Sequence, residues 1–255
     1  MDGRRDGVML ADRSSSSVAA LLEAGVDGVI LPFGATEQHG PHLPLDTDTR
    51  LATELARRIA RRLDDTLVAP AVPLGPSAEH GSFPGTLSLR PGTLERVVGD
   101  VVESLDRQGF ERVVLLPGHG GSFPAIDAVY PELTRRTNAD VVAVTGLGRF
   151  LDRLQEGLRE AGVEVDEPAG HAGAAETAML LAVAPELVGE RPRGHTGPVS
   201  AAALFSRGVE TYDENGVLGD ARPATAEVGE ALLEHLAQAY AAYVREEFRA
   251  LDDRP

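Results

Sequence analysis

The sequence contains no cysteine among its 255 residues. Disulfide bonds, thiol nucleophiles, thiolate-bound zinc and iron–sulfur clusters are therefore excluded together. Lysine is also absent, so the 24 basic residues are all arginine. Without lysine the chain cannot form a Schiff base, which rules out ordinary pyridoxal-phosphate chemistry and lysine-dependent aldol chemistry. The lysine of a P-loop is missing for the same reason.

Positive charge is scarce, because 24 basic residues face 40 acidic ones and the net charge is -16. This balance argues against nucleic acid or an anionic membrane surface as a partner. Uninterrupted apolar runs of about 18 residues, the length of a membrane span, are also lacking. No apolar stretch of signal-peptide length follows the first residues, so we expect a cytoplasmic protein. The length predicts a single domain over residues 1–255.

Potential metal ligands are concentrated in the segment GATEQHGPHLPLDTD at residues 34–48. Five of them fall within twelve residues: Glu37, His39, His42, Asp46 and Asp48. An apolar run at residues 26–33 precedes the segment and predicts a buried strand. Leucine and isoleucine at helical spacing follow it and predict a helix over residues 49–63. The ligands therefore lie where a strand ends, which is where active sites form in open α/β sheets.

Apolar runs and helical patterns alternate along the rest of the chain. Further strands are predicted at residues 67–74, 112–116 and 141–145, and helices at 93–108, 124–137, 149–161 and 224–251. Residues 189–223 are predicted as mostly loop. Alternation of this kind favours a largely parallel sheet with helices on both faces. Polar, glycine-rich motifs that follow three of the strands should therefore cluster along one edge of the sheet.

The first motif has the composition of a metal site. Glu37 and His39 are two residues apart, so in an extended segment their side chains point to the same side. His119 follows the third predicted strand. Carboxylate oxygens and imidazole nitrogens suit Zn²⁺, Mn²⁺ or Fe²⁺. A carboxylate such as Asp48 can bridge two ions about 3.5–4 Å apart.

Each of these residues also has a structural interpretation. Asp48 alone can serve as a helix N-cap. His42 is as well suited to packing as to ligation, and Asp46 can hold an imidazole N–H instead of touching metal. Glu176, in the first turn of a predicted helix, can cap it, or can act as a fifth ligand or general base. His171 is expected to shuttle a proton to the departing amine, since histidine titrates near neutrality.

A polar loop follows the second predicted strand and offers further contacts. We expect four of its side chains to contact the substrate, namely those of Ser77, Glu79, His80 and Ser82.

Several motifs resemble those of the creatininase-like amidohydrolases. The segment at residues 34–48 is similar to the family hallmark G-[AS]-x-E-Q-H-G-P-H-L-P-L-x-T-D. Residues 82–88 resemble the F-P-G-T segment, residues 118–121 the G-H-G-G turn, and residues 171–177 the H-A-G-x-x-E-T motif. Residues 216–220 look like a late family segment. These motifs follow one another in the family's order across most of the chain.

The resemblance implies a three-layer α/β/α fold, often a hexamer, and two metal ions that serve amide hydrolysis. It implies that Glu37, His39, Asp48 and His119 are ligands, with Asp48 as the bridge. Creatininase itself carries a glutamate where this chain has Gly121. Glu176 is expected to supply the missing ligand. Many relatives also carry asparagine at the position of Ser122.

The resulting expectation is an amidohydrolase in which metal-bound hydroxide attacks the carbonyl of a small amide or short peptide. Within the family, a mycofactocin-type precursor-peptide peptidase is an alternative. The change at Gly121 also leaves open a catalytically reduced metal-binding scaffold. A phosphate cradle at residues 118–121 is disfavoured, because the turn lacks a dinucleotide-binding fingerprint.

Overall fold

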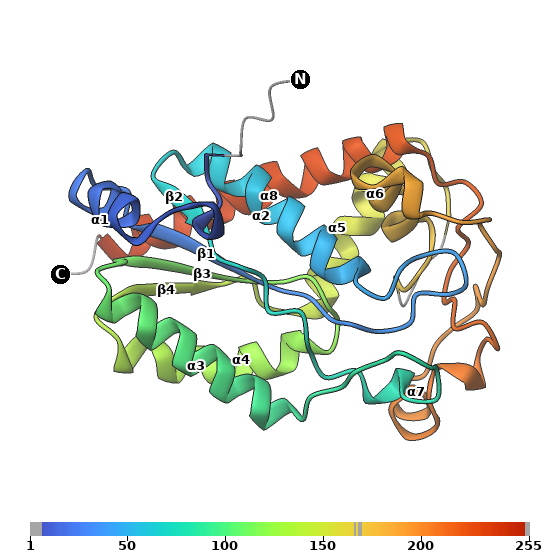
Figure 1. The fold of residues 1–255 in the computed structure, drawn as a ribbon. Coiled ribbons are helices and arrows are strands. Elements are labelled where there is room, and N and C mark those ends of the chain that lie inside the picture. The colour runs from blue at the N-terminus through green and yellow to red at the C-terminus, as the bar shows by residue number, and fades with distance from the viewer. Residues whose placement is uncertain (1–6, 166, 168–169, 253–255) are drawn as a thin grey trace.

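The chain folds around a parallel sheet, seen in a computed structural model that describes residues 7–165, 167 and 170–252. Within these residues four strands pair in the order β2-β1-β3-β4, all parallel (Figure 1). Their bounds are β1 Gly28–Phe33, β2 Thr66–Val68, β3 Arg112–Pro117 and β4 Asp140–Ala143. The predicted parallel sheet is confirmed.

Helices cover both faces of the sheet, which gives the three layers (Figure 1). The helices α2, α5, α6 and α8 share one hydrophobic core with one face, and α1, α3 and α4 share another core with the opposite face. Their bounds are α1 Ser15–Glu23, α2 Thr47–Leu63, α3 Pro91–Arg107, α4 Ser122–Arg136, α5 Leu147–Glu160, α6 Ala174–Val183, α7 Ala201–Arg207 and α8 Ala226–Asp252. The short 3₁₀ turns are η1 Leu10–Asp12, η2 Ala78–His80, η3 Pro185–Leu187 and η4 Val209–Thr211.

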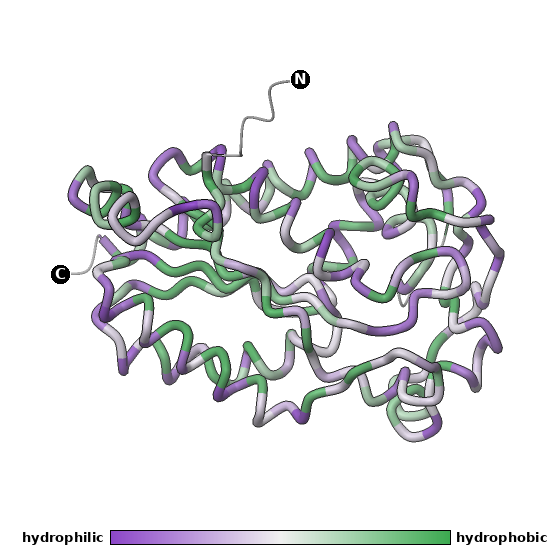
Figure 2. Tube along the Cα trace, viewed as in Figure 1, coloured by the Kyte–Doolittle hydropathy of each residue, from purple (hydrophilic) through white to green (hydrophobic). Residues whose placement is uncertain are grey.

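Strand β1 shows why the sheet is buried on both faces. Val29 and Leu31 pack into the core formed with α3 and α4, while Ile30 packs into the core on the opposite face. Successive side chains of a strand alternate between faces, so a strand buried on both sides must be apolar at every position. The strands accordingly form the hydrophobic centre of the molecule in Figure 2. Among the described residues, no helix is long and apolar enough to cross a membrane.

Two local predictions were wrong, and a third was incomplete. The strand predicted at residues 67–74 ends at Val68, because proline lacks the N–H that a strand ladder needs, and beyond it Val72 forms only an isolated bridge with Phe33. Helix α2 begins at Thr47, so Asp48 lies within its first turn and is not the N-cap. The loop predicted at residues 189–223 contains helix α7, whose N-cap Ser200 accepts a hydrogen bond from the amide of Ala203.

Candidate metal centre

The predicted ligands meet at the carboxyl ends of β1 and β3. A close approach between the chain after β1 and the first turn of α2 makes this possible. A Cβ atom on Gly34 would lie 2.4 Å from the Cα of Thr49, so only glycine fits there. This contact brings the start of α2, with Asp48, against the segment that carries Glu37 and His39.

Asp48 is the centre of the cluster. Its side chain is buried, and its two oxygens face different histidines. Oδ1 lies 3.0 Å from His39 Nε2, and Oδ2 lies 3.1 Å from His119 Nδ1. The carboxylate therefore joins the segment after β1 to the turn after β3, which is a role that helix capping would not require.

Backbone carbonyl groups fix which nitrogen of each histidine faces the cluster. His39 Nδ1 donates to the carbonyl oxygen of Glu37 at 3.2 Å, which leaves Nε2 toward Asp48. His119 Nε2 donates to the carbonyl oxygen of Pro76 at 2.6 Å, which leaves Nδ1 toward the carboxylates. Histidines that bind metals almost always hold their other N–H in this way.

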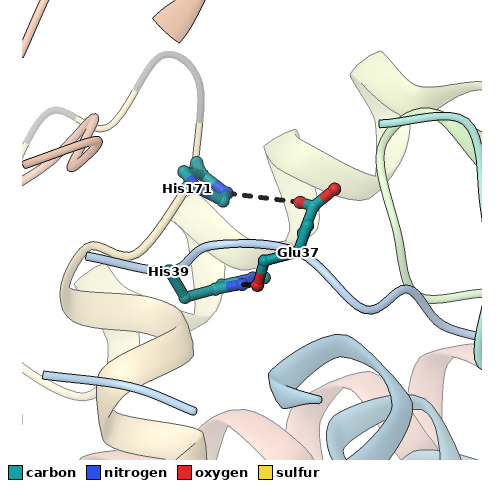
Figure 3. A group of neighbouring side chains, drawn as sticks. All are labelled: Glu37, His39 and His171. Atoms are coloured by element: carbon teal, nitrogen blue, oxygen red, sulfur yellow. Dashed lines mark hydrogen bonds and ion pairs between the residues drawn. The ribbon is translucent and has the colours of Figure 1, made fainter. Parts of the chain in front are cut away.

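Three groups of side chains bring ligand atoms within 4.8 Å of one another. Glu37, Asp48 and His119 form the first group, and His39, Asp48 and Glu176 form the second. Glu37, His39 and His171 form the third (Figure 3). Asp48 belongs to the first two groups, so the expected pairing of Glu176 with the cluster is present in the geometry.

Unpartnered oxygen atoms show that the cluster suits cations. Glu37 Oε2 is buried without a hydrogen-bond partner among the described residues, and Asp48 Oδ2 is buried with only the ion pair to His119. Buried polar atoms are rarely left in this state unless an ion or water completes them. The oxygen and imidazole donors match the preferences of divalent first-row metals.

The cluster is strongly charged without a metal. Burial alone would lower the pKa of His39, but the carboxylates of Asp48 and Glu176 raise it to about 10. Glu37 and Asp48 likewise hold the pKa of His119 well above its usual value, against the effect of burial. Burial would raise the pKa of Glu37, but His119 and His80 lower it to about 2. Protons on His39 and His119 thus balance the carboxylates where metal ions would otherwise do so.

Gln38 holds a second pair of histidines, and sequence reasoning missed this residue. Its Oε1 accepts from the amide of Gly40 at 2.9 Å, so its Nε2 is the donor. That Nε2 lies 2.8 Å from His80 Nδ1 and 2.9 Å from His171 Nε2. The same Nε2 lies 3.1 Å from the carbonyl oxygen of Gly216, so its two N–H groups are shared among three acceptors. A donor that faces both rings favours unprotonated nitrogens there, which leaves the ring protons on His80 Nε2 and His171 Nδ1. The available signal was a glutamine between two predicted ligands.

His171 is neutral in this setting, which corrects the expectation that its pKa lies near neutrality. Burial, together with the nearby His80 and His39, holds the pKa of His171 well below its usual value. Burial also lowers the pKa of His80. The ring of His171 lies between those of His39 and His80, with centroids 4.5 and 4.4 Å away. Its Nδ1 lies 3.8 Å from Glu37 Oε1 (Figure 3).

Glu176 contributes a further carboxyl group to the site from the start of α6. It lies in the first turn of α6, as predicted, and its Oε2 accepts from the amide of Ala172 at 2.6 Å. Oε2 also lies 3.6 Å from His39 Nε2. Burial raises the pKa of Glu176 to about 8, and the charge of Asp48 acts in the same direction. This carboxyl group therefore accepts a hydrogen bond from the loop before α6 and also faces the cluster.

The backbone leaves no room for a glutamate at position 121. A Cβ atom on Gly121 would lie 1.9 Å from the carbonyl oxygen of Pro76 and 2.7 Å from His119 Nε2. The same carbonyl group orients His119. The position that carries a glutamate in creatininase is thus occupied here by the hydrogen bond that fixes a histidine.

The other predicted residues lie around the cluster. His42 is buried and shares a hydrogen bond with Thr177, at 2.9 Å between Nε2 and Oγ1, and it belongs to none of the three groups. Asp46 bonds Arg50 at 2.8 Å and holds no imidazole, which corrects that expectation.

The four residues predicted in the polar loop lie in three different settings. Glu79 and His80 line the cavity over the cluster. Ser77 is fully buried, with Oγ 3.3 Å from His119 Nε2. Ser82 is exposed and is not part of the cavity lining.

A three-layer α/β/α fold with buried carboxylates and imidazoles at its strand ends is an arrangement suited to metal-dependent hydrolysis. The chain matches the family described as "Creatininase: Creatinine amidohydrolase" over residues 11–244. It belongs to the creatininase family. With relatives named as an amidohydrolase and as peptidases, it is a hydrolase of carbon–nitrogen bonds.

Similar proteins include a mycofactocin precursor peptide peptidase of Mycolicibacterium smegmatis. It is 36% identical over 227 residues, which is 84% of this chain and 83% of the relative. The creatinine amidohydrolase of Pseudomonas putida is 31% identical over 259 residues, covering 94% and 97% of the two chains.

Solved structures agree. One described as "Creatininase Mn" superposes with a TM-score of 0.77 at 29% identity, covering 94% of this chain and 98% of the other. A creatininase structure of "Zn-Zn type" has a TM-score of 0.75, also at 29% identity, and the same coverage. Together with the buried cluster, these structures support divalent metal binding.

Proposed function

We propose that this chain hydrolyses an amide bond at a site for two divalent metal ions, Zn²⁺, Mn²⁺ or Fe²⁺. Glu37, Asp48 and His119 would hold one ion. His39, Asp48 and Glu176 would hold the other. The single observation that carries this proposal is the placement of Asp48, whose two oxygens each face a different ligand group.

The side chains around the cluster have defined tasks in such a reaction. When bound, the ions polarise the amide carbonyl and lower the pKa of water to about 7. Water adds its oxygen to the carbonyl carbon, the C–N bond breaks, and the nitrogen leaves with a proton as an amine. Neutral His171 would donate a hydrogen bond from Nδ1–H to the substrate, because Gln38 occupies its other nitrogen. Glu79 and His80 would contact the substrate from the cavity wall.

Hydrolysis of a peptide bond is the second candidate. The mycofactocin precursor peptide peptidases are between 34% and 36% identical to this chain. Gly121 also argues against creatinine as the substrate, because the backbone here has no room for the glutamate that creatininase carries at this position. Creatinine, a small amide and short peptides should therefore be compared in one assay.

Turnover before and after metal removal tests the proposal. The chain, stripped with a chelator and reloaded with Zn²⁺, Mn²⁺ or Fe²⁺, should hydrolyse an amide or peptide only in the loaded form. Glu37→Gln should remove this activity, whereas Glu95→Gln, a change on the outer part of α3, should keep it. Equal turnover by the stripped protein would overturn the proposal.

A further inference from the structure

The cavity over the cluster has two unlike sides. It encloses about 360 Å³, within the range of small-molecule sites. Its polar side is the cluster itself. Its apolar side contains the residues Leu89, Pro91, Pro124, Leu147, Phe150, Leu151, Leu204, Phe205, Val209 and Leu218. Such an extensive apolar lining has no use in binding a small polar amide alone.

Separate segments build the apolar side. Helix α5 contributes Leu147 and Leu151, and helix α7 contributes Leu204 and Phe205. Helix α7 contacts η2, the turn that carries His80, and so lies beside the cluster. In Figure 1 the α7 ribbon lies next to the teal segment that contains η2.

The segment around α7 is closed by hydrogen bonds between its two ends. Tyr212 Oη accepts from the amide of Ser200 at 2.9 Å and lies 3.2 Å from its carbonyl oxygen. Val209, two residues after the helix, is fully buried and attaches the segment to the wall of the cavity.

The charges of the cavity select against anions. No arginine is found among the described residues that line it, and the chain has no lysine. Its ionisable side chains are the carboxyl groups of Glu37, Asp48, Glu79 and Glu176 and the imidazoles of His80, His119 and His171, of which only His119 carries a positive charge, and only without metal. The metal ions would neutralise the carboxylates of the cluster, but Glu79 lies outside the two ligand groups. An anionic substituent would find no partner on the apolar side and would lose its hydration.

Phe205 is the most exposed part of this surface. It is 68% exposed, compared with 55% for Leu87 and 38% for Leu187 and Leu45, the other large apolar side chains that are exposed among the described residues. Unlike those leucines, Phe205 lines the cavity. A ligand that covers it removes apolar area from water, which favours binding by about 25 cal/mol per Å².

We propose that the surface formed by Leu147, Leu151, Leu204 and Phe205 is a subsite for an uncharged apolar group of the substrate. The group is of aromatic or branched aliphatic size and is attached to the amide that the cluster cleaves. This inference rests on the proposed function, because it assigns the substrate class of the same site. It excludes substrates whose group in this subsite carries a carboxylate or phosphate.

Matched amides test the subsite on the metal-loaded full chain. Phenylacetamide is compared with acetamide, and N-benzylformamide with formamide, so that the apolar group lies on either side of the scissile bond. A para-carboxyl derivative of each aromatic amide tests charge. One of the two aromatic compounds should exceed its small partner in kcat/KM by about 10-fold or more, the range seen for groups in apolar pockets. Its carboxylated derivative should lose that gain.

Variants locate the effect. Phe205→Ser should reduce the ratio of aromatic to small-amide kcat/KM about tenfold, and Phe205→Arg should favour the carboxylated derivative. Leu187→Ser, an exposed apolar residue outside the lining, should leave the ratio unchanged. Circular dichroism and sedimentation verify that fold and association state are retained. An unchanged ratio in Phe205→Ser would overturn the subsite, whether or not the association state changes.

Failure of the proposed function has a different signature. If no amide is turned over, calorimetry measures the binding of phenylacetamide to the loaded protein and to Phe205→Ser. Binding that weakens about tenfold in the variant supports the subsite without hydrolysis. Equal binding, or none, contradicts the subsite as well.

Discussion

Two pairs of histidines lie at one site and differ in charge, one pair being protonated and the other neutral. His39 and His119 face carboxylates and keep their protons, because Asp48, Glu37 and Glu176 raise their pKa values. His80 and His171 accept from the amide of Gln38 and are neutral. Burial acts in the same direction on all four rings, so burial does not separate the pairs. Their hydrogen-bond partners do.

The difference assigns a chemical task to each pair. In the protonated pair, the protons on His39 Nε2 and His119 Nδ1 face the carboxylates, and metal ions would replace them; backbone carbonyl groups already hold each ring by its other nitrogen. The neutral pair presents N–H groups to the cavity. One glutamine and one aspartate thus divide four identical side chains into a protonated and a neutral pair, which under the proposed function would serve as ligands and as hydrogen-bond donors.

The largest effect is expected from Asp48→Asn, which breaks the first pair. The change removes the charge shared by both ligand groups, so metal content should fall and turnover should drop at least about 1000-fold. The pKa values of His39 and His119 should fall with it, since burial then prevails. Metal analysis, kinetics and NMR titration measure the three quantities.

Asp46→Asn is the matched control, two residues away. Asp46 pairs with Arg50 on the surface, where an ion pair contributes about 0–1 kcal/mol. Activity close to that of the unaltered chain is expected. A similar loss in both variants would contradict the special role of Asp48.

The next effect is the pH dependence of metal affinity. His39, with a pKa of about 10, and His119 both hold protons at neutral pH, and metal binding must displace them. Glu176, with a pKa of about 8, must also lose its proton. Affinity should therefore rise with pH, by up to about 1000-fold per unit near neutrality, where about three protons are released, and less steeply above pH 8, where only the two histidines still release protons. Competition with a chelator of known affinity measures the slope. A slope near zero would mean that both rings are neutral without metal.

Gln38→Glu should make the second pair resemble the first. A carboxylate in this position favours protonated imidazoles, so the pKa values of His80 and His171 should rise. Turnover should fall about 10–100-fold, the usual cost of disturbing groups that orient a metal site. Nitrogen-15 NMR of the imidazoles reports the tautomers directly. Gln108→Glu, on the surface beside Ser104, is the control and should shift neither ring.

Sequence patterns predicted the parallel sheet because strands buried on both faces must be apolar along their buried length, as β1 is throughout and β3 is after Arg112. They also predicted which side chains meet, since the carboxyl ends of neighbouring parallel strands share an edge. Glu176 joined the cluster as expected, but its distance to His39 depends on how α6 packs, which no local pattern encodes. The roles of Gln38 and Phe205 depend on contacts between segments more than 40 residues apart.

The smallest effect is expected from Gly121→Ala, which disturbs only the hydrogen bond that orients His119. The added Cβ displaces the Pro76 carbonyl oxygen, so unfolding free energy should fall by about 1–3 kcal/mol and metal affinity with it. Gly120→Ala is the matched control, because its Cβ meets only Leu147 Cδ1 at 3.8 Å. There the change should stay within about 0.5 kcal/mol. Urea denaturation compares the two, and equal stability would contradict the crowding at position 121.

The most direct test of the central claim is the number of ions per chain, measured by elemental analysis of the loaded protein and of Glu176→Gln. Two ligand groups that share Asp48 predict two ions in the unaltered chain and about one in the variant, since only the second group contains Glu176. One ion in the unaltered chain, with no change in Glu176→Gln, would contradict the shared site.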